Sequence, residues 1–225
     1  MGSQRAVRDA VIVDAVRTPF GRRAGSLSHW HPVDLAAETL TALADRVGID
    51  PAVVDDVIMG CVMQVGEQGT NIARNAVLAA EWPEHIPGTT IDRQCGSGQQ
   101  AVHFAAQGVM AGAYDVAIAS GVEVMTRIPM GSSTADGRYG FPFGPSVSAR
   151  YAERGGLVPQ GEAAEMIADL WGITRDEMDE YGLLSQQRAV TALREGRFEP
   201  EIIPVSGDDG GAIATDGGVR ETSMT

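Results

Sequence analysis

Apolar positions along the chain alternate between short continuous runs and longer helical stripes. Runs of strand length occupy residues 10–16, 57–62, 89–91 and 116–119. Their largely unbroken apolar character is typical of strands that are buried on both faces of a sheet. Between them, apolar side chains recur at helical spacing in residues 32–47, 71–80 and 99–110. Strands that alternate with helices predict an α/β layered sheet with crossover connections.

The pattern changes in the second half of the chain. Residues 126–160 are rich in Gly, Pro, Ser and Arg without clear periodicity, and so long an irregular stretch is usually functional or flexible. Two helices are expected after it, and the second is opened by a capping box of Thr174 and Glu177. We therefore expect an N-terminal α/β domain over residues 1–125 and an α-rich domain over residues 126–225.

Charge and composition exclude several classes of function. The formal net charge is −13, so nucleic acid is not expected as a partner, because binding phosphate backbones needs a basic face. All 17 basic residues are arginines. A side-chain Schiff base and a Walker-type phosphate loop both require Lys and are excluded. An anionic ligand would have to be held by a local group of arginines.

The cysteine content bounds the compartment and the cofactors. Two cysteines, Cys61 and Cys95, provide neither a disulfide framework nor a zinc site, so we expect no metal and a reducing, cytoplasmic location. No apolar run approaches the ~20 residues of a membrane span.

Cys95 stands where an apolar run ends and a helical stripe begins, in the segment TTIDRQCGSGQQA of residues 89–101. The unpaired N–H groups and the positive dipole end of a helix favour a thiolate there. Gly96 and Gly98 allow a substrate to approach the backbone, and the same N–H groups suit an oxyanion. The alternative is a buried, inert cysteine. We prefer that alternative for Cys61, which lies inside an apolar run.

A thiol nucleophile also needs a base, and the histidines offer little. His103 lies eight residues beyond Cys95 on the same expected helix, which places it ~12 Å away. His29 and His31 flank a tryptophan in an expected loop. His85 lies in a loop bounded by prolines before the Cys95 segment and is the one candidate kept, but the residues themselves indicate a nucleophile whose base lies outside this chain.

Several segments resemble thiolases. Residues 60–68 and 71–74 resemble the thiolase pattern GCV-x-Q-x-G-x-(G)Q-N-x-AR. The segment around Cys95 resembles the family's C-x-SG-x-QA element, and residues 115–125 resemble the strand D-x-x-x-AGG-x-E-x-M that follows it. Residues 13–21 are similar to the family's opening strand. Further matches in the second half are similar to its helical loop domain, so the resemblance runs in order from about residue 10 to residue 225.

The resemblance implies the first half of a thiolase fold, a layered α/β structure with a mixed sheet between helices, followed by an α-rich loop domain. It implies a 3-ketoacyl-CoA thiolase or acetyl-CoA acetyltransferase, with Cys95 as the nucleophile that carries the acyl group as a thioester. The N–H of Cys95 would be one oxyanion donor. Coenzyme A would be a co-substrate, with no permanently bound cofactor, and the protein would form a homodimer or tetramer.

The resemblance also suggests residues that bind substrate or coenzyme A. Arg220 matches a loop-domain arginine near coenzyme A, although it could be an ordinary solvated arginine. Gln64 matches a position near the active site and the dimer contact, although it could be a polar residue at a strand end. Gln160 falls where biosynthetic thiolases have a His-Met-Gly element. Together with the Gln99–Gln100 pair, this departure predicts an acyl group larger than acetoacetyl, polycyclic or branched.

Other departures concern what is missing. Thiolases are about twice this long, and their second half supplies an activating histidine, a second cysteine and an Asn/His pair, none of which has a counterpart here. We therefore expect the chain to be a fragment that does not turn over by itself. Two alternatives stay open: a related condensing enzyme, and a non-catalytic or partner-dependent subunit that binds acyl-CoA.

Overall fold

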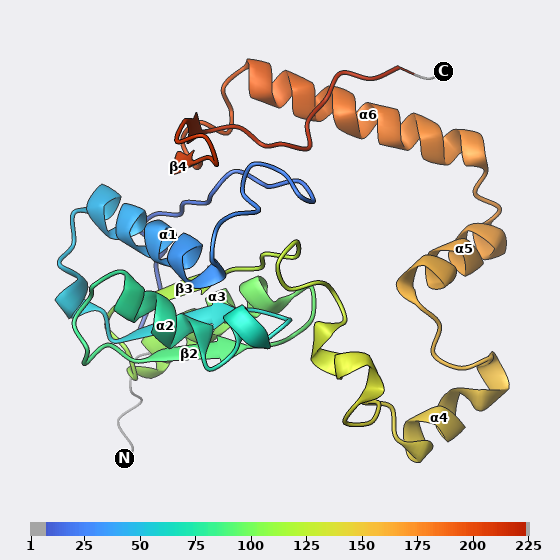
Figure 1. Ribbon diagram of the computed structural model, residues 1–225, viewed down its shortest axis with the longest axis horizontal. Helices are drawn as coiled ribbons and strands as arrows, with labels where there is room; N and C mark the ends of the chain where they lie inside the picture. The colour runs from blue at the N-terminus through green and yellow to red at the C-terminus, as the bar shows by residue number, and fades with distance from the viewer. Residues whose placement is uncertain (1–7, 224–225) are drawn as a thin grey trace, which may run out of the picture. The chain divides into compact units, whose positions relative to one another are not determined.

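The computed structural model describes residues 8–223 and divides into two compact units (Figure 1). The first unit holds the residues up to Ser133 together with Pro200–Gly218, and the second holds Thr134–Glu199 with the residues after Gly218. None of the helices described is long and apolar enough to cross a membrane.

The first unit is built on a parallel sheet of three strands, in the order β2-β1-β3. Its strands are β1 (Asp56–Gly60), β2 (Gly88–Ile91) and β3 (Ala117–Gly121). All five residues of the central strand β1 are buried, as expected for a strand covered on both faces. The predicted α/β architecture is confirmed, and where a mixed sheet was expected, these three strands are all parallel.

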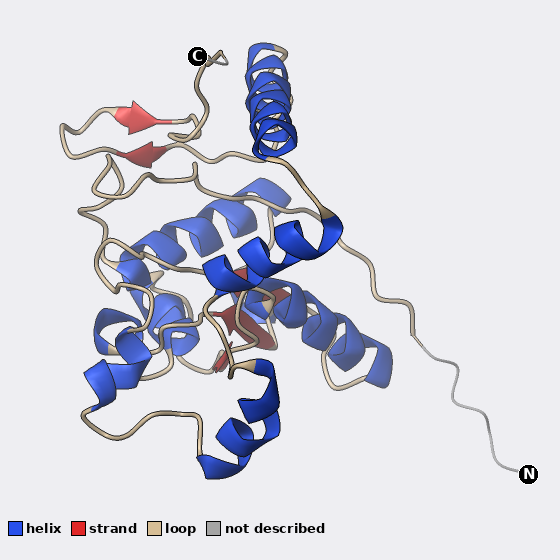
Figure 2. Ribbon diagram, turned by 90° about the vertical axis from the view of Figure 1, so that its right-hand side faces the viewer, coloured by secondary structure: helices blue, strands red, loops and turns tan. Residues whose placement is uncertain are grey.

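Helices cover both faces of this sheet (Figure 2). Val57 and Met59 point to one face and pack with residues of α1 (Pro32–Val47) and α2 (Ile72–Ala79). Ile58 points to the other face, where it packs on α3 (Ser97–Ala111). Because side chains alternate along β1, this strand contributes to an apolar layer on each face of the sheet. Short 3₁₀ helices occur at Pro51–Val53, Gly66–Gln68, Ser132–Gly137 and Ala152–Arg154.

The helix boundaries follow the signals in the sequence. Pro32 is the first residue of α1, and Gly48 ends it with a left-handed φ of 71°. The Asn71 side chain caps α2 by accepting the Arg74 N–H. The predicted helices of the first unit are thus confirmed to within about two residues.

The strand predicted at residues 10–16 is wrong. The pairing next to it is a single parallel bridge, between Arg17 and Ile202, and Val11, Ile12 and Val13 are exposed. A strand forms only where a neighbour accepts and donates its hydrogen bonds, and the described residues give this apolar run no such neighbour.

The returning segment Pro200–Gly218 is tied to the first unit by Arg17, whose guanidinium binds Glu201 at 2.7 Å and Asp216 at 2.7 Å. It contains the antiparallel pair β4 (Val205–Ser206) and β5 (Ala212–Ile213). The compact units therefore differ from the predicted domains in two ways. The first unit extends to Ser133, and it also includes the segment Pro200–Gly218.

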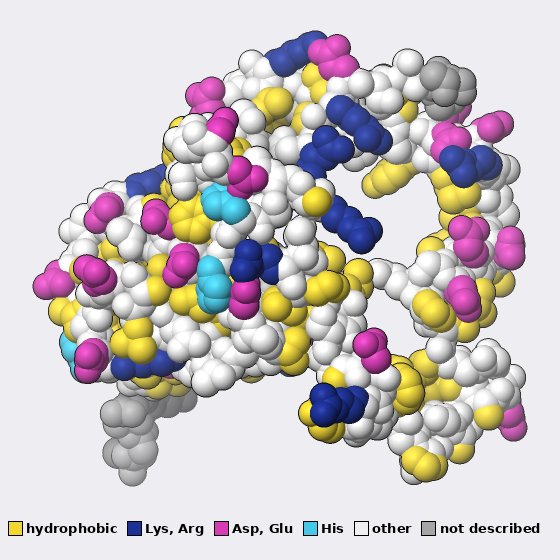
Figure 3. All heavy atoms as spheres, viewed as in Figure 1, with side chains coloured by type: hydrophobic (Ala, Val, Ile, Leu, Met, Phe, Trp, Pro, Cys, Tyr) yellow, Lys and Arg dark blue, Asp and Glu magenta, His cyan; other side chains and the backbone are white. Residues whose placement is uncertain are grey.

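The second unit consists mainly of helices: α4 (Pro145–Tyr151), α5 (Gln160–Trp171) and α6 (Arg175–Arg194). The capping box of Thr174 and Glu177 is confirmed at the start of α6. Helix α4 was not predicted, because it lies in the Gly- and Pro-rich stretch. Apolar side chains such as Leu170 and Trp171 are exposed along α5, and Figure 3 shows apolar side chains on the surface of this unit.

Candidate active site

The carboxyl ends of the three parallel strands meet at one edge of the sheet. Gly60 of β1 is in register with Ile91 of β2 and with Gly121 of β3. Beyond this row, Cys61 N–H donates to the Ile91 carbonyl at 3.0 Å, and Val122 N–H donates to the Gly60 carbonyl at 3.1 Å. Sites in open parallel sheets form at this edge, where the connections diverge.

Cys95 lies in the turn between β2 and α3, and it is exposed with a free thiol. Asp92 Oδ1 accepts the Gln94 N–H at 2.7 Å, and the Arg93 carbonyl accepts the Gly96 N–H at 3.0 Å. Gln94 has a left-handed φ of 47°. The strand, turn and helix predicted around Cys95 are therefore confirmed, and the N–H groups directly after Cys95 are used within the turn, since Ser97 N–H donates to the Gln94 carbonyl at 3.0 Å.

Gly60 brings the end of β1 against the first turn of α3. A Cβ on Gly60 would lie 2.5 Å from the Gly98 nitrogen and 2.5 Å from the Ser97 carbonyl carbon. No side chain fits in that space. This contact fixes the start of the helix relative to the strand, and with it the turn that carries Cys95.

Cys61 lies at the same edge and is 1% exposed, which confirms the prediction that it is buried. Gln68, which is 0% exposed, donates from Nε2 to Cys61 Sγ at 3.4 Å and to Glu123 Oε1 at 2.7 Å. Burial, with the nearby carboxylates of Glu123 and Asp92, raises the pKa of Cys61 to about 12. This thiol is not poised to react as a thiolate.

The Glu123 carboxylate also holds the loops at the sheet edge by hydrogen bonds. Glu123 accepts the Val62 N–H at 2.8 Å and the Met63 N–H at 3.2 Å, while Gln68 Oε1 accepts the Val124 N–H at 2.8 Å. Gln68 and Glu123 were not identified from the sequence as site residues. Their bond spans 55 positions, and local pattern does not reveal such a contact.

The histidine proposed as a base does not fit that role. His85 contacts the Ala52 carbonyl at 3.3 Å in the loop before the amino end of β2, whereas Cys95 follows the carboxyl end of that strand. The strand alone separates these ends by ~10 Å. His31 caps α1, and His29 pairs with Asp208.

The other predicted residues divide between the two units. Gln64, in the first unit, is exposed, and its Nε2 donates to the Cys61 carbonyl at 3.0 Å. Gln160 and Arg220 are exposed residues of the second unit; Gln160 begins α5, and the Arg220 N–H donates to Gln186 Oε1 at 3.2 Å. Their roles toward substrate stay predictions.

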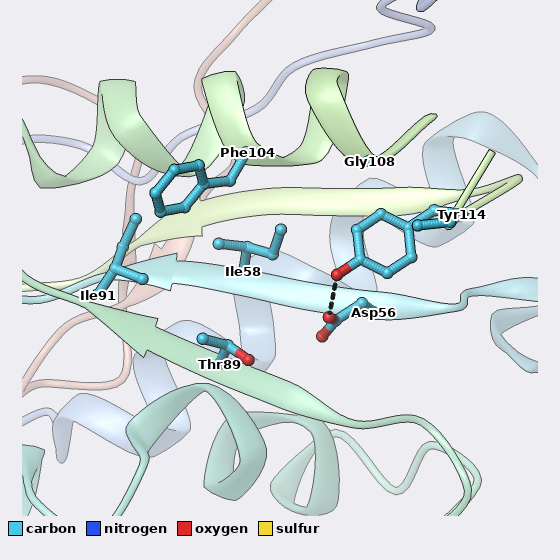
Figure 4. Close-up of a pocket in the computed structure, with 8 residues that line it drawn as sticks. Asp56, Ile58, Thr89, Ile91, Phe104, Gly108 and Tyr114 are labelled. Atoms are coloured by element: carbon cyan, nitrogen blue, oxygen red, sulfur yellow. Dashed lines mark hydrogen bonds between the residues drawn. The ribbon is translucent and has the colours of Figure 1, made fainter. Parts of the chain in front are cut away.

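A separate hollow of about 270 Å³ lies on the α3 side of the sheet (Figure 4). Ile58, Ile91 and Phe104 line it, and Tyr114 donates to Asp56 Oδ2 there at 2.8 Å. Asp56 Oδ1 is buried and has no hydrogen-bond partner within residues 8–223. Because Asp56 begins β1, this pair lies at the amino end of the strand, away from Cys95.

Comparison with known proteins shows which family this chain is similar to. The family model described as "Thiolase, N-terminal domain" matches residues 10–224. The chain belongs to the thiolase family. Its membership confirms the fold implied by the motifs.

Two relatives show how far the likeness extends. The chain is 46% identical to the steroid 3-ketoacyl-CoA thiolase FadA6 of Mycobacterium tuberculosis, over 99% of this chain and 55% of that thiolase. It is 42% identical to a 3-ketoacyl-CoA thiolase of Erwinia tasmaniensis, over 90% of this chain and 51% of that enzyme. The chain thus spans about half the length of these thiolases.

Proposed function

We propose that this chain supplies the nucleophile of a thiolase, an enzyme that converts a 3-ketoacyl-CoA and coenzyme A into acetyl-CoA and a shortened acyl-CoA. The observation that carries the proposal is the exposed Cys95 thiol in a strand–turn–helix at the carboxyl edge of the sheet. Its contrast with the buried Cys61 supports the choice between the two thiols.

In the proposed reaction, the Cys95 thiolate attacks the 3-keto carbonyl, and the Cys95 N–H is one donor to the oxyanion. The bond between C2 and C3 of the substrate breaks, the two-carbon portion takes up a proton and leaves as acetyl-CoA, and the acyl group stays on sulfur. Attack by a second coenzyme A then releases the shortened acyl-CoA and restores the thiol. The groups that exchange protons are not among the site residues described here.

We further propose a bulky acyl group. The sequence departures at Gln160 and at Gln99–Gln100 predict it, and the name of the steroid 3-ketoacyl-CoA thiolase supports it. In this proposal coenzyme A is a co-substrate without a resident cofactor, and Arg220, Gln160 and Gln64 contact the substrate. Formation of a homodimer or tetramer and a cytoplasmic location stay predictions from the sequence.

The decisive measurement is mass spectrometry of the chain after incubation with acyl-CoA. A thioester on Cys95, absent from Cys95→Ser, supports a catalytic nucleophile, whereas no adduct supports the alternative of a subunit that only binds acyl-CoA. The acyl group is tested in the same way, with butanoyl-CoA against the coenzyme A thioester of a steroid carboxylic acid. Faster acylation by butanoyl-CoA would contradict the bulky substrate.

A further inference from the structure

One buried hydroxyl holds the turn that carries Cys95. Ser97 is 4% exposed, and its Oγ accepts the Arg93 N–H at 2.8 Å and donates to the Gln94 carbonyl at 2.6 Å. The hydroxyl thus uses both its donor and an acceptor site on the two residues that immediately precede Cys95.

These bonds sustain an unfavourable backbone conformation. Gln94 has a φ of 47°, and a residue with a Cβ adopts this left-handed conformation only when its surroundings impose it. Ser97 binds the Gln94 carbonyl twice, through its hydroxyl and through its own N–H at 3.0 Å, while Asp92 holds the Gln94 N–H. Without the hydroxyl, the peptide groups before Cys95 lose two of these hydrogen bonds.

Ser97 does not serve as a helix cap, the more common use of a serine at such a place. The N-cap of α3 is Gly96, which offers no side-chain bond to the helix, and the Ser97 hydroxyl is directed backward into the turn. The hydroxyl therefore acts on the turn before Cys95 and not on the helix, so the orientation of the Cys95 peptide group depends on it.

We propose that Ser97 is a positioning residue: its hydroxyl locks Gln94 so that the Cys95 sulfur and the Cys95 N–H converge on one acyl carbonyl. The inference rests on the proposed role of Cys95 as the acyl-accepting nucleophile. It assigns the hydroxyl a function in acylation that is separate from packing, because alkylation of the thiol requires no oxyanion donors.

The test uses the whole chain and two reactions of the same thiol, alkylation by iodoacetamide and acylation by butanoyl-CoA, both followed by mass spectrometry. Loss of an oxyanion donor costs ~10²-fold or more, so a misaligned Cys95 N–H in Ser97→Ala is expected to slow acylation about tenfold more than alkylation. Ser97→Thr, which keeps the hydroxyl, should recover most of the acylation rate. The matched control is Ser120→Ala, because Ser120 also donates to a backbone carbonyl of the first unit, that of Ile58, and should leave both rates unchanged.

Each outcome decides the proposal. Equal slowing of both reactions in Ser97→Ala, or no slowing, overturns it. If Ser97→Ala unfolds, labelling of Cys61 would reveal it, and Asp92→Ala is then used instead. Asp92→Ala removes the hydrogen bond to the Gln94 N–H and must slow acylation more than alkylation. An unchanged ratio of the two rates overturns the proposal. A wild-type chain that forms no thioester contradicts the proposed function instead. In that case this inference, which rests on that function, is overturned with it.

Discussion

Cys61 directly follows β1, and Cys95 follows β2 by four residues at the same edge of the sheet, yet the first thiol is 1% exposed and the second is exposed. After β1 the buried Gln68 side chain donates to the Cys61 sulfur. After β2 a left-handed residue turns the chain outward before a helix begins. The reactivity of each cysteine therefore depends on how the chain leaves its strand.

The largest expected effect is a difference in the reactivity of these two thiols. A rise of the Cys61 pKa from its ordinary value of 9.0 to about 12 lowers its thiolate fraction about a thousandfold at mildly alkaline pH. Iodoacetamide should thus modify Cys95 in the folded chain and leave Cys61 intact, as peptide mapping can measure. Cys95→Ser should take up no label until urea unfolds it, and labelling of Cys61 in the folded chain would contradict the comparison.

The sequence allowed much of this contrast to be predicted. The apolar run around Cys61 indicated burial, and the glycines after Cys95 indicated a turn before a helix, because both signals are local. The cover over Cys61 was not predictable in this way, since Gln68 and Glu123 lie far apart in the chain. The strand prediction for residues 10–16 was wrong for a related reason. An apolar run indicates burial, but a strand forms only if another segment of the chain pairs with it.

Gln68→Leu is expected to remove the cover of Cys61 and to lower the free energy of unfolding by about 2–4 kcal/mol, since it leaves the buried Val124 N–H and the Met63 carbonyl unpaired. Urea denaturation measures the loss, and Cys61 should become labelled while the Cys95 rate changes little. Gln64→Leu is the matched control, because this exposed glutamine makes one bond to a backbone carbonyl. Equal losses in the two variants would show that the buried network contributes nothing specific.

Gly60→Ala, at the end of the strand before Cys61, should alter the turn that contains Cys95. The added Cβ would press on Ser97 and Gly98, and overpacking of this kind costs about 1–3 kcal/mol. The start of α3 must shift, so the alkylation rate of Cys95 should change while Cys61 stays protected. Gly98→Ala provides the opposite case, because nothing lies within 4 Å of its Cβ, and a helix gains up to about 1 kcal/mol from alanine. Similar stability in both variants would contradict the tight contact.

The smallest effect belongs to the amino end of β1, where Tyr114→Phe should cost about 1 kcal/mol and leave both cysteine rates unchanged, because the lost bond to Asp56 lies away from their edge. The hydrogen bond to the Asp56 carboxylate, with burial, raises the pKa of Tyr114 above its ordinary value of 10.0. A raised folded pKa stabilises the folded chain below pH 10, and this contribution is lost as the pH rises through the folded pKa. The difference in unfolding free energy between wild type and Tyr114→Phe should therefore be constant near neutral pH and shrink in strong alkali. Tyr181→Phe, at an exposed tyrosine, should show no difference at any pH. A Tyr114→Phe effect that persists unchanged in alkali would mean that the hydroxyl's bond to Asp56 is not its source.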